Sequence, residues 1–351
     1  MTMNPDIENS LKKTPQYTRL KRHITTLLNH STPLKIYNLF KVEVDRIRKK
    51  KVVAGYPYII IFDTGNICNL QCPLCPTGLR ETSVNRQLVK FQDFKKAIDI
   101  FAPYAYEVTL HNWGEPFLNP DILEMLHYSS VKNIGTNLST NLNTFPFSAE
   151  KLIQTGLEYL IVSLDGTSQD VYSTYRVGGK LENVLGNLKS IIQEKKRMKS
   201  KTPFIEWQFL VMKHNCHQID EAKRMAKELG VDLIRFIPVG LPFDINDKQK
   251  LAEKWYPYIP PDKEGYTIDR FLQKPAEGGC FYLYRSITIN PVGVVAPCCA
   301  VWKESESFGS LLDTELSQIW NNEYYQGARE LFSNGDKTAQ TSCARCPLFK
   351  K

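Results

Sequence analysis

Long apolar runs are missing from this sequence of 351 residues. No stretch approaches the roughly 18 consecutive apolar residues of a membrane-spanning helix, which excludes a transmembrane segment. The first eight residues lack the basic and apolar regions of a secretory signal peptide, so we expect a cytoplasmic protein. With 42% hydrophobic and 23% charged residues, the chain is neither disordered nor of low complexity, and it is long enough for one large domain or two ordinary ones.

Acidic residues are scarce in only one part of the chain. There are 45 Lys and Arg against 37 Asp and Glu, and residues 1–54 account for the whole excess with 12 basic and 4 acidic residues. The densest part, residues 46–51, reads RIRKKK. This run is either the solvated end of a helix or a docking surface for an acidic partner, a membrane or nucleic acid. No aromatic residues are interleaved with the basic ones and no nucleic-acid-binding module is present, so we expect no nucleic acid.

Helix and strand patterns alternate along most of the chain. Residues 1–54 are predicted to be helical, with a helix start at Ser31-Thr32-Pro33 and then an apolar series at helical spacing: Ile36, Tyr37, Phe40, Val44 and Ile47. Beyond them, strands are expected at 57–62, 107–111, 135–139, 159–164, 204–212 and 233–239, with helices at 91–101, 121–129, 148–155, 181–198 and 219–229. This alternation predicts an α/β fold with parallel strands, either barrel-like or an open sheet.

A second, smaller module is expected at the carboxyl end. Residues 241–279 are rich in Pro, Asp, Lys and Gly and are predicted to be a linker. A β-hairpin is expected at 286–295, with its turn at Asn290-Pro291, and a helix at 315–320. The predicted organisation is therefore a helical basic extension (1–54), a core (55–240), the linker (241–279) and the small module (280–351).

Three of the nine cysteines lie close together, directly after the first core strand. Cys68, Cys72 and Cys75 follow the strand at its carboxyl end, where active sites of parallel α/β folds gather. Clustered cysteines in a chain of this length indicate a metal before disulfides. A closed structural site takes four protein ligands, so three leave one coordination position for another molecule. A chance structural or zinc-binding role is the alternative.

This Cys-x3-Cys-x2-Cys loop resembles the signature of the radical S-adenosylmethionine (SAM) enzymes. The resemblance implies that the three cysteines hold a [4Fe–4S] cluster whose fourth iron binds SAM. It also implies reductive cleavage of SAM to a 5′-deoxyadenosyl radical, which abstracts hydrogen from a C–H bond. The expected fold is then the family's partial (β/α)6 barrel, a TIM-like barrel, with a small auxiliary-cluster domain of a β-hairpin plus a helix after it.

Further positions resemble the family in strand order. Trp113-Gly114-Glu115-Pro116 follows the second strand, where the family has a Gly-Gly-Glu-like segment that binds the SAM amino group; here Trp replaces the first Gly. The other expected SAM-binding residues follow the third and fourth strands: Ser139, Asn141, Ser163, Asp165 and Arg176. By similarity, Ser163 and Arg176 contact the SAM ribose or carboxylate, and an Arg fork suits a carboxylate. Each residue taken alone is more often structural.

Four other cysteines form a second group: Cys280, Cys298, Cys343 and Cys346. A structural zinc ribbon is one interpretation. The spacing Gly293-x4-Cys298, the helix around Trp320 and the final Cys-x2-Cys resemble instead the SPASM auxiliary-cluster domain of radical SAM enzymes. Four cysteines suit its abridged one-cluster form, called twitch, and imply an auxiliary [4Fe–4S] cluster. Cys299 adjoins Cys298, and the spacing assigns the ligand to Cys298.

Two clusters together imply an oxidative reaction. Abstraction of hydrogen from a carbinol carbon must be followed by loss of a proton and an electron, which an auxiliary cluster can accept. The layout resembles twitch-type enzymes that oxidise an aminocyclitol alcohol, so the first hypothesis is dehydrogenation of a secondary alcohol on a sugar or aminocyclitol. The alternative is a peptide maturase or an epimerase acting on a ribosomal peptide or carbohydrate; residues 1–54 are too short and too helical for the peptide-binding domain common there. A non-enzymatic metal-binding scaffold explains the cysteines but not the Gly114–Pro116 segment.

Several remaining residues are candidates for substrate chemistry. Cys216, beyond the fifth strand, and Cys299 are possible hydrogen donors, although a plain loop cysteine is the alternative. The possible substrate contacts are His111, Glu206, Gln208 and Arg235, of which Glu206 and Gln208 share one strand face. Each of them is otherwise a polar residue satisfied by its neighbours. The family also implies a one-electron donor of the flavodoxin or ferredoxin type, which the basic residues 46–51 are suited to meet.

Overall fold

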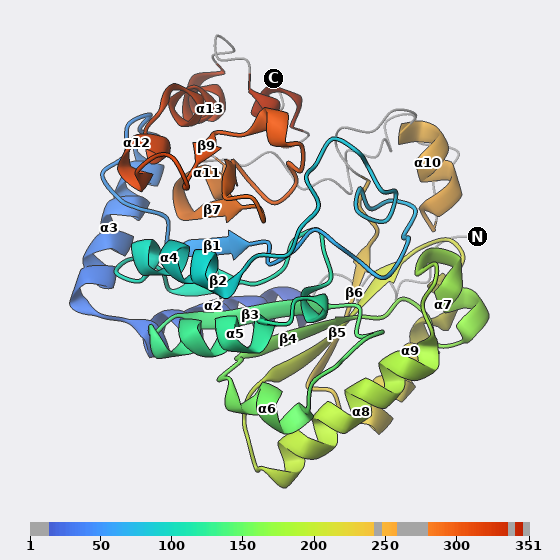
Figure 1. Ribbon diagram of the computed structural model, residues 1–351. Helices are drawn as coiled ribbons and strands as arrows, with labels where there is room; N and C mark the ends of the chain where they lie inside the picture. The colour runs from blue at the N-terminus through green and yellow to red at the C-terminus, as the bar shows by residue number, and fades with distance from the viewer. Residues whose placement is uncertain (1–13, 242–247, 258–279, 336–340, 347–351) are drawn as a thin grey trace.

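The computed structural model describes residues 14–241, 248–257, 280–335 and 341–346. Six parallel strands form its centre, as the sequence predicts (Figure 1). They are β1 (Ile59–Phe62), β2 (Glu107–Thr109), β3 (Gly135–Thr140), β4 (Tyr159–Ser163), β5 (Phe204–Val211) and β6 (Leu233–Pro238). Neighbours along the chain are neighbours in the sheet, from β1 to β6. The expected α/β fold, consistent with a partial TIM-like barrel, is confirmed.

Amphipathic helices cover the outer face of these strands (Figure 1). They are α4 (Phe91–Phe101), α5 (Ile122–Val131), α6 (Ala149–Gln154), α7 (Gln169–Tyr175), α8 (Leu181–Arg197) and α9 (Ile219–Leu229). In α4, for example, Phe94, Ile98 and Phe101 recur at helical spacing and are fully buried. Ser148 caps α6 by accepting the Lys151 N–H. The apolar core lies between these helices and the sheet, so strand carboxyl ends are left to present polar loops.

The carboxyl-terminal segment continues the same sheet. Its elements are α11 (Tyr282–Arg285), β7 (Ser286–Ile289), β8 (Val294–Ala296), η4 (Glu304–Glu306), β9 (Gly309–Ser310), α12 (Leu316–Trp320), α13 (Glu323–Asn334) and η5 (Ser342–Arg345). β7 pairs in parallel with β1, Ile59 opposite Ser286, while β8 and β9 follow antiparallel. The predicted hairpin is present, but its pairing with the core and helix α13 were not predicted. Backbone hydrogen bonds between β1 and β7 thus join the segment that carries the second cysteine group to the core that carries the first.

Part of the expected linker is helical. α10 spans Lys248–Trp255, and its Trp255 is buried against the Tyr175 ring, whose centroid lies 5.4 Å away. The expected linker's remaining residues, 242–247 and 258–279, lie outside the described residues, as do residues 1–13 of the basic extension.

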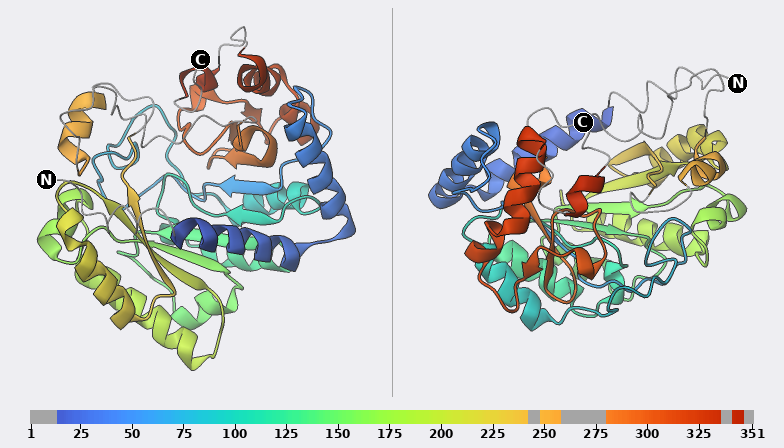
Figure 2. Two further views of the ribbon diagram at one scale, coloured as in Figure 1. Left: turned by 180° about the vertical axis from the view of Figure 1, so that it is seen from behind. Right: turned by 90° about the horizontal axis from the view of Figure 1, so that it is seen from above.

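Two helices precede the first strand, as predicted, and lie on the outside of the molecule (Figures 1 and 2). They are α2 (Thr14–His30) and α3 (Pro33–Ile47). Arg22 of α2 donates to the Glu107 carboxylate at 2.9 Å, at the start of β2. Thr32 caps α3 by accepting the Lys35 N–H. None of the helices in the described ranges is both long and apolar enough to cross a membrane.

Candidate functional site

The first cysteine group lies on a tight loop at the carboxyl end of β1. The loop folds through backbone hydrogen bonds from the Cys75 N–H to the Cys72 carbonyl (3.1 Å) and from the Leu79 N–H to the Cys75 carbonyl (2.8 Å). Gly78 closes over it: a Cβ there would lie 2.5 Å from the Cys72 carbonyl oxygen, far inside van der Waals contact. Only glycine therefore permits this turn, which places Cys68, Cys72 and Cys75 along one short loop.

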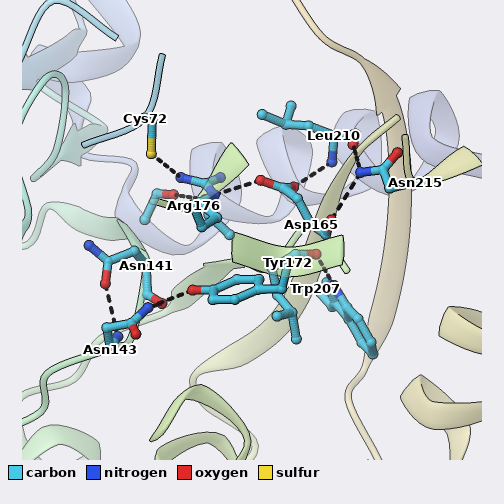
Figure 3. Close-up of polar contacts among 12 residues, drawn as sticks. Cys72, Asn141, Asn143, Asp165, Tyr172, Arg176, Trp207, Leu210 and Asn215 are labelled. Carbon is cyan, nitrogen blue, oxygen red and sulfur yellow. Dashed lines mark hydrogen bonds and ion pairs between the residues drawn. The ribbon is translucent and has the colours of Figure 1, made fainter. Parts of the chain in front are cut away.

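Hydrogen-bond donors from three elements point at two of these sulfur atoms. The Leu70 N–H lies 3.4 Å from Cys68 Sγ, and Asn141 Nδ2, beyond β3, lies 3.7 Å from the same sulfur. Arg176 Nη1, beyond α7, lies 3.8 Å from Cys72 Sγ (Figure 3). N–H donors and a nearby cation stabilise a sulfur that carries negative charge. The surroundings of Cys68 and Cys72 therefore suit thiolates.

Burial alone opposes that ionised state. It raises the pKa of Cys68 to about 12, and it raises the pKa of Cys72 as well, although Arg176 acts against it there. Thiols in such a place ionise when a metal supplies the compensating positive charge. The donor set and its burial therefore fit an iron–sulfur cluster held by this loop.

Arg176 is held in place by a buried carboxylate (Figure 3). Its Nε donates to Asp165 Oδ2 at 2.6 Å, while the other oxygen of Asp165 accepts the Leu210 N–H at 2.7 Å. Asp165 is completely buried. Burial raises the pKa of the Asp165 carboxyl, whereas Arg176 and the Leu210 N–H oppose that rise. Asp165 and Arg176, each predicted from the sequence as a SAM-binding residue, thus form one ion pair that directs the Arg176 guanidinium toward the cysteine loop.

Gly114 allows a close approach between the loops that follow β1 and β2. A Cβ on Gly114 would lie 1.7 Å from the Gly65 carbonyl oxygen, so no other residue fits. The next N–H, that of Glu115, donates to the Ile67 carbonyl at 2.9 Å, and Pro116 begins the short helix η1 (Pro116–Leu118). The Trp-Gly-Glu-Pro segment is therefore fixed directly beside the cysteine loop, as the sequence predicts.

The buried Glu115 carboxylate accepts three hydrogen bonds that hold this segment in place. It accepts the Thr140 hydroxyl (2.7 Å), the Asn141 N–H (2.7 Å) and the Phe117 N–H (3.1 Å). Burial raises the pKa of Glu115 to about 7, against the effect of these donors. The side chain thereby ties the end of β3 to η1 and positions Asn141 over Cys68. A direct contact of Glu115 with SAM stays a prediction.

Three further candidates meet at neighbouring strand ends. The Ser139 and Ser163 hydroxyl oxygens lie 3.3 Å apart, and the Ser139 N–H donates to His111 Nδ1 at 2.9 Å. Burial, with Arg22 nearby, lowers the pKa of His111 to about 4, so the ring is neutral and accepts this bond. His111 therefore has a structural partner, and the two serines remain grouped at the carboxyl ends of β3 and β4.

The polar residues of β5 and β6 bind one another. Arg235 Nε donates to Glu206 Oε1 and its Nη2 to Gln208 Oε1, both at 2.5 Å, and the Tyr159 hydroxyl donates to Glu206. Glu206 and Arg235 are both buried. The three predicted substrate contacts thus form a satisfied network, and contact with a substrate stays a prediction.

The second cysteine group comes together from three distant segments. Cys280 precedes α11, Cys298 follows β8, and Cys343 and Cys346 lie at η5. Burial raises the pKa of Cys280 to about 11, with Cys346 and Cys299 adding to the rise; burial also raises the pKa of Cys343, with Cys280 and Cys346 adding. The thiols affect one another's pKa because they lie near one another, and Cys298 has Cys343 and Cys280 nearby in the same way. Cys299 directs its own Sγ to the Tyr282 hydroxyl, 3.6 Å away.

The four cysteines of this group suit two kinds of site, a [4Fe–4S] cluster and a zinc ribbon, since each takes four protein ligands. Within the described residues, no three His, Cys, Asp or Glu side chains are placed to hold one metal ion. In an iron–sulfur cluster each thiolate binds a different iron, so the sulfur atoms stand further apart than around one zinc ion.

A small cavity lies between residues that flank Cys75 and residues that flank Cys298, and two of its polar residues, Asp63 and Thr288, were not predicted from the sequence. Its volume is about 30 Å³, and it is lined by Pro76 and Thr77 of the cysteine loop, by Trp113, and by residues that include Asp63 and Thr288. Asp63, directly after β1, accepts the Trp113 N–H at 3.2 Å; burial raises its pKa to about 7. Thr288 Oγ1 is buried and has no hydrogen-bond partner in the part of the chain that the structure describes. An acidic residue directly after the apolar strand Ile59–Phe62 was the available signal.

Asn112, which lines this cavity next to Trp113, joins the core to the carboxyl-terminal segment. With its amide in the orientation that satisfies both groups, Asn112 donates to the Cys299 carbonyl (3.2 Å) and accepts from Trp113 Nε1 (3.1 Å). Cys216, in contrast, donates to the Lys213 carbonyl at 3.5 Å in the loop after β5. Among the described residues, its hydrogen bonds do not reach either cysteine group.

Comparison with known proteins bears directly on this site. A family model described as the radical SAM superfamily matches residues 63–205, and one described as SPASM, an iron–sulfur cluster-binding domain, matches residues 280–347. The first contains Cys68, Cys72 and Cys75; the second contains all four cysteines of the second group. These two matches imply a [4Fe–4S] cluster with SAM and an auxiliary iron–sulfur cluster.

The chain is similar to curated proteins of diverse activity. It is 28% identical over 51% of its length to an AdoMet-dependent heme synthase of Methanosarcina barkeri, of which it covers 49%. It is 24% identical over 76% of its length to the subtilosin biosynthesis protein AlbA of Bacillus subtilis, covering 60% of it, and 25% identical over 83% to the PqqA peptide cyclase of Ruegeria pomeroyi, covering 79%. The chain thus spans about half to three fifths of the first two.

The fold also matches solved structures. Streptococcus suis SuiB bound to S-adenosylmethionine superimposes with a TM-score of 0.61 at 16% identity, over 86% of this chain and 74% of that one. Both family models, and the cysteine groups inside them, lead to one conclusion. The chain belongs to the radical SAM superfamily and carries a SPASM iron–sulfur cluster-binding domain.

Proposed function

We propose that this protein dehydrogenates a secondary alcohol on a small polar metabolite, such as a sugar or aminocyclitol. In this proposal Cys68, Cys72 and Cys75 hold the cluster that binds SAM, and the four cysteines of the second group hold an auxiliary cluster. When bound, these groups supply a radical that removes a hydrogen atom from carbon and an acceptor for one electron. The side chains near these groups bind and orient SAM and accept the substrate's proton.

The residues beside the first group bind and orient SAM. The Gly114–Pro116 segment presents its backbone to the amino group, and Ser139 and Ser163 lie at neighbouring strand ends. Arg176 is kept charged and directed by Asp165, 2.6 Å away, so it is ready to hold a carboxylate. Glu115 acts as a positioning residue, because its carboxylate is occupied by three donors from the protein.

The observation that carries the proposal is the buried carboxyl of Asp63, which lines a small cavity between residues that flank Cys75 and residues that flank Cys298. At about 30 Å³ this cavity has room for one hydroxyl group or water molecule. Oxidation of a carbinol to a carbonyl removes a hydrogen atom from carbon, a proton from oxygen and one further electron. Asp63 accepts backbone N–H groups, as Glu115 does, but unlike Glu115 it lines the cavity. Burial raises its pKa to about 7 against these donors, which suits it to accept the hydroxyl proton near neutral pH. Thr288 offers a hydroxyl with no partner among the described residues, which supports a hydrogen bond to substrate.

A peptide substrate is the second candidate, and the relatives favour it. The PqqA peptide cyclase is named for a peptide, and it matches 83% of this chain, across both matched domains. AlbA is named for biosynthesis of a bacteriocin. In either case the reaction needs an external one-electron donor of the flavodoxin or ferredoxin type.

Deuterium transfer separates the candidates. The reconstituted protein would be incubated with SAM, dithionite and either polyols deuterated at the carbinol carbons or ribosomal precursor peptides deuterated at Cα and Cβ. We expect deuterium in 5′-deoxyadenosine from a polyol, together with the matching ketone. Asp63→Asn should lower ketone formation at least tenfold, while Asp93→Asn, an exposed control on α4, should not. Deuterium from peptides alone would support the second candidate, and deuterium from neither would contradict both.

A further inference from the structure

Helix α3 points its apolar face to solvent and its polar face toward the protein. The apolar series recognised in the sequence faces solvent: Ile36, Tyr37, Phe40 and Ile47 are 54%, 57%, 66% and 69% exposed. The opposite face, which is buried against the protein, carries three polar or charged side chains among its four residues: Lys35, Asn38, Val42 and Asp45. An amphipathic helix of a globular protein normally buries the other side.

Specific bonds fix α3 in this orientation. Asn38 accepts the Tyr56 N–H (2.8 Å) and donates to the Tyr56 carbonyl (2.9 Å), just before β1. Asp45 accepts the Ala54 N–H at 2.6 Å, and Lys35 donates to a backbone carbonyl after α5 at 2.6 Å. Rotating the helix to bury its apolar face would leave the backbone groups that these side chains bind without partners. The outward apolar face is therefore built into the fold.

Helix α2 repeats the pattern. Leu20, Ile24 and Leu28 form a stripe at a spacing of four residues and are 58%, 48% and 73% exposed. The side turned toward the sheet is polar: Arg22 binds Glu107, and His30 accepts or donates to Glu158 at 2.6 Å. Two consecutive helices thus present apolar side chains outward over polar contacts with the core. We call this surface, with the exposed basic residues 48–51 that follow α3, the outer helical face.

We propose that the outer helical face docks the protein on the surface of an anionic lipid bilayer. Exposed Leu, Ile and Phe beside clustered Lys and Arg are the features of helices that lie in the lipid interface. The charge complements that surface at Arg48 and Lys49, which are exposed. The other three basic residues of 46–51 are paired within the protein: Arg46 with Glu43, Lys50 with Asp45 and Lys51 with Glu330. Lys41 adds to it, with its ammonium 4.3 Å from the Tyr37 ring centroid.

The other occupants of such a face fit less well. A two-fold contact with a second copy would bring two basic segments toward each other, which costs free energy. An acidic protein, such as an electron donor, would meet the basic residues but would not need the apolar stripes of both helices. Docking at this face also leaves the active site accessible: α3 contacts the amino ends of the strands, whereas the cysteine loop follows the carboxyl end of β1 (Figure 1).

Vesicle sedimentation of the full reconstituted chain tests the proposal. Wild-type protein should partition onto vesicles of phosphatidylglycerol and phosphatidylcholine at least tenfold better than onto phosphatidylcholine alone, and less well in high salt. The variant Ile36→Ser/Phe40→Ser/Ile47→Ser should lose at least tenfold on the anionic vesicles, and so should Lys41→Gln/Arg48→Gln/Lys49→Gln. The control Val131→Ser, which changes a 67% exposed residue elsewhere, should bind like wild type.

Other results would overturn the proposal. If wild type binds anionic vesicles no better than neutral ones, or the triple-Ser variant binds as wild type does, the face does not dock on lipid. If light scattering shows a dimer that the triple-Ser variant dissociates, the face is a self-association interface. If only the basic variant slows reduction by flavodoxin, with vesicle binding absent, the occupant is an acidic protein. The iron content and 5′-deoxyadenosine yield should be unchanged in both variants, which separates this proposal from the proposed function.

Discussion

At the residue scale, single atoms decide whether the loops around the first cysteine group can form. Gly114 approaches the Gly65 carbonyl so closely that a Cβ would stand 1.7 Å from its oxygen. Gly186, in the middle of α8, has nothing within 4 Å of the corresponding position. The two glycines therefore do opposite things: the first is required by a backbone contact, and the second weakens a helix.

Replacing each glycine with alanine tests this contrast. Gly114→Ala must separate two loops and should destabilise the protein by about 3 kcal/mol or more, with loss of SAM-dependent cleavage. Gly186→Ala should stabilise the protein by about 0.5–1 kcal/mol, because alanine favours helix. Urea unfolding of both variants measures the difference. Equal stabilities for the two would show that the close approach to Gly65 is not as tight as described.

The Arg176–Asp165 pair is the second residue-scale feature. Arg176→Gln leaves Asp165 buried without its ion-pair partner and should cost about 3–5 kcal/mol of stability. In Arg176→Gln/Asp165→Asn the buried charge is gone as well, so this double variant should be more stable than Arg176→Gln. Because Arg176 also reaches Cys72 Sγ at 3.8 Å, losing its charge should make the reduction potential of the bound cluster more negative. A redox titration followed by electron paramagnetic resonance measures that shift; an unchanged potential would contradict the contact.

At the element scale, the periodic parts of the fold could be predicted and the contacts between distant parts could not. The six core strands and the helices after them follow local apolar spacing, so α4 is found at the residues predicted. Nothing local indicates that β7 pairs with β1, because pairing depends on where the chain returns after residue 279. The orientation of α3 also escapes sequence reasoning: its spacing predicts a helix, but the face that is buried is chosen by Asn38 and Asp45 bonding to the backbone near 54–56.

The same limits apply to the site. The three cysteines could be singled out because the family motif has a fixed spacing. Gly114, Ser163 and Arg176 were singled out because they follow successive strands in the family's order, and their contacts with SAM stay predictions. Asp63 and Thr288 were missed, since their significance depends on two strands that are far apart in sequence. Glu206, Gln208 and Arg235 looked available from strand alternation, but neighbouring strands let them satisfy one another.

Arg22 is one of three residues of α2, with His23 and His30, that bind carboxylates of the core. Although burial opposes ionisation, Arg22, with His23 and Asn137, lowers the pKa of Glu107 from 4.5 to about 2. A depressed folded-state pKa contributes stability that is present above pH 4.5 and is lost as the pH falls through 2. Arg22→Gln should therefore cost about 3–5 kcal/mol at pH 7, and its loss of stability on acidification should be shallower.

Lys21→Gln is the matched control for this prediction. Lys21 is the adjacent residue, is exposed, and carries the same charge, so its replacement should change stability by less than about 0.5 kcal/mol. Unfolding curves between pH 3 and pH 7 give both quantities. If the two variants unfold alike, Arg22 does not anchor α2.

At the scale of the whole molecule, one continuous sheet joins two cysteine groups. β1 ends at the first group and β7 and β8 lead to the second, and these strands are neighbours. The cavity lined by Asp63 and Thr288 lies beside residues that flank Cys75 and Cys298. The outer helical face, formed by α2 and α3, is at the amino ends of the strands, away from that space.

The central claim is that the chain holds two separate iron–sulfur clusters, and metal analysis tests it most directly. Iron and acid-labile sulfide would be measured after anaerobic reconstitution of three proteins: wild type, Cys68→Ala/Cys72→Ala/Cys75→Ala, and Cys280→Ala/Cys298→Ala/Cys343→Ala/Cys346→Ala. Two [4Fe–4S] clusters predict about eight iron atoms per wild-type chain and about four in each variant. Only the variant with Cys68, Cys72 and Cys75 intact should still release 5′-deoxyadenosine from SAM. Zinc without sulfide, or an unchanged iron count in either variant, would contradict the account.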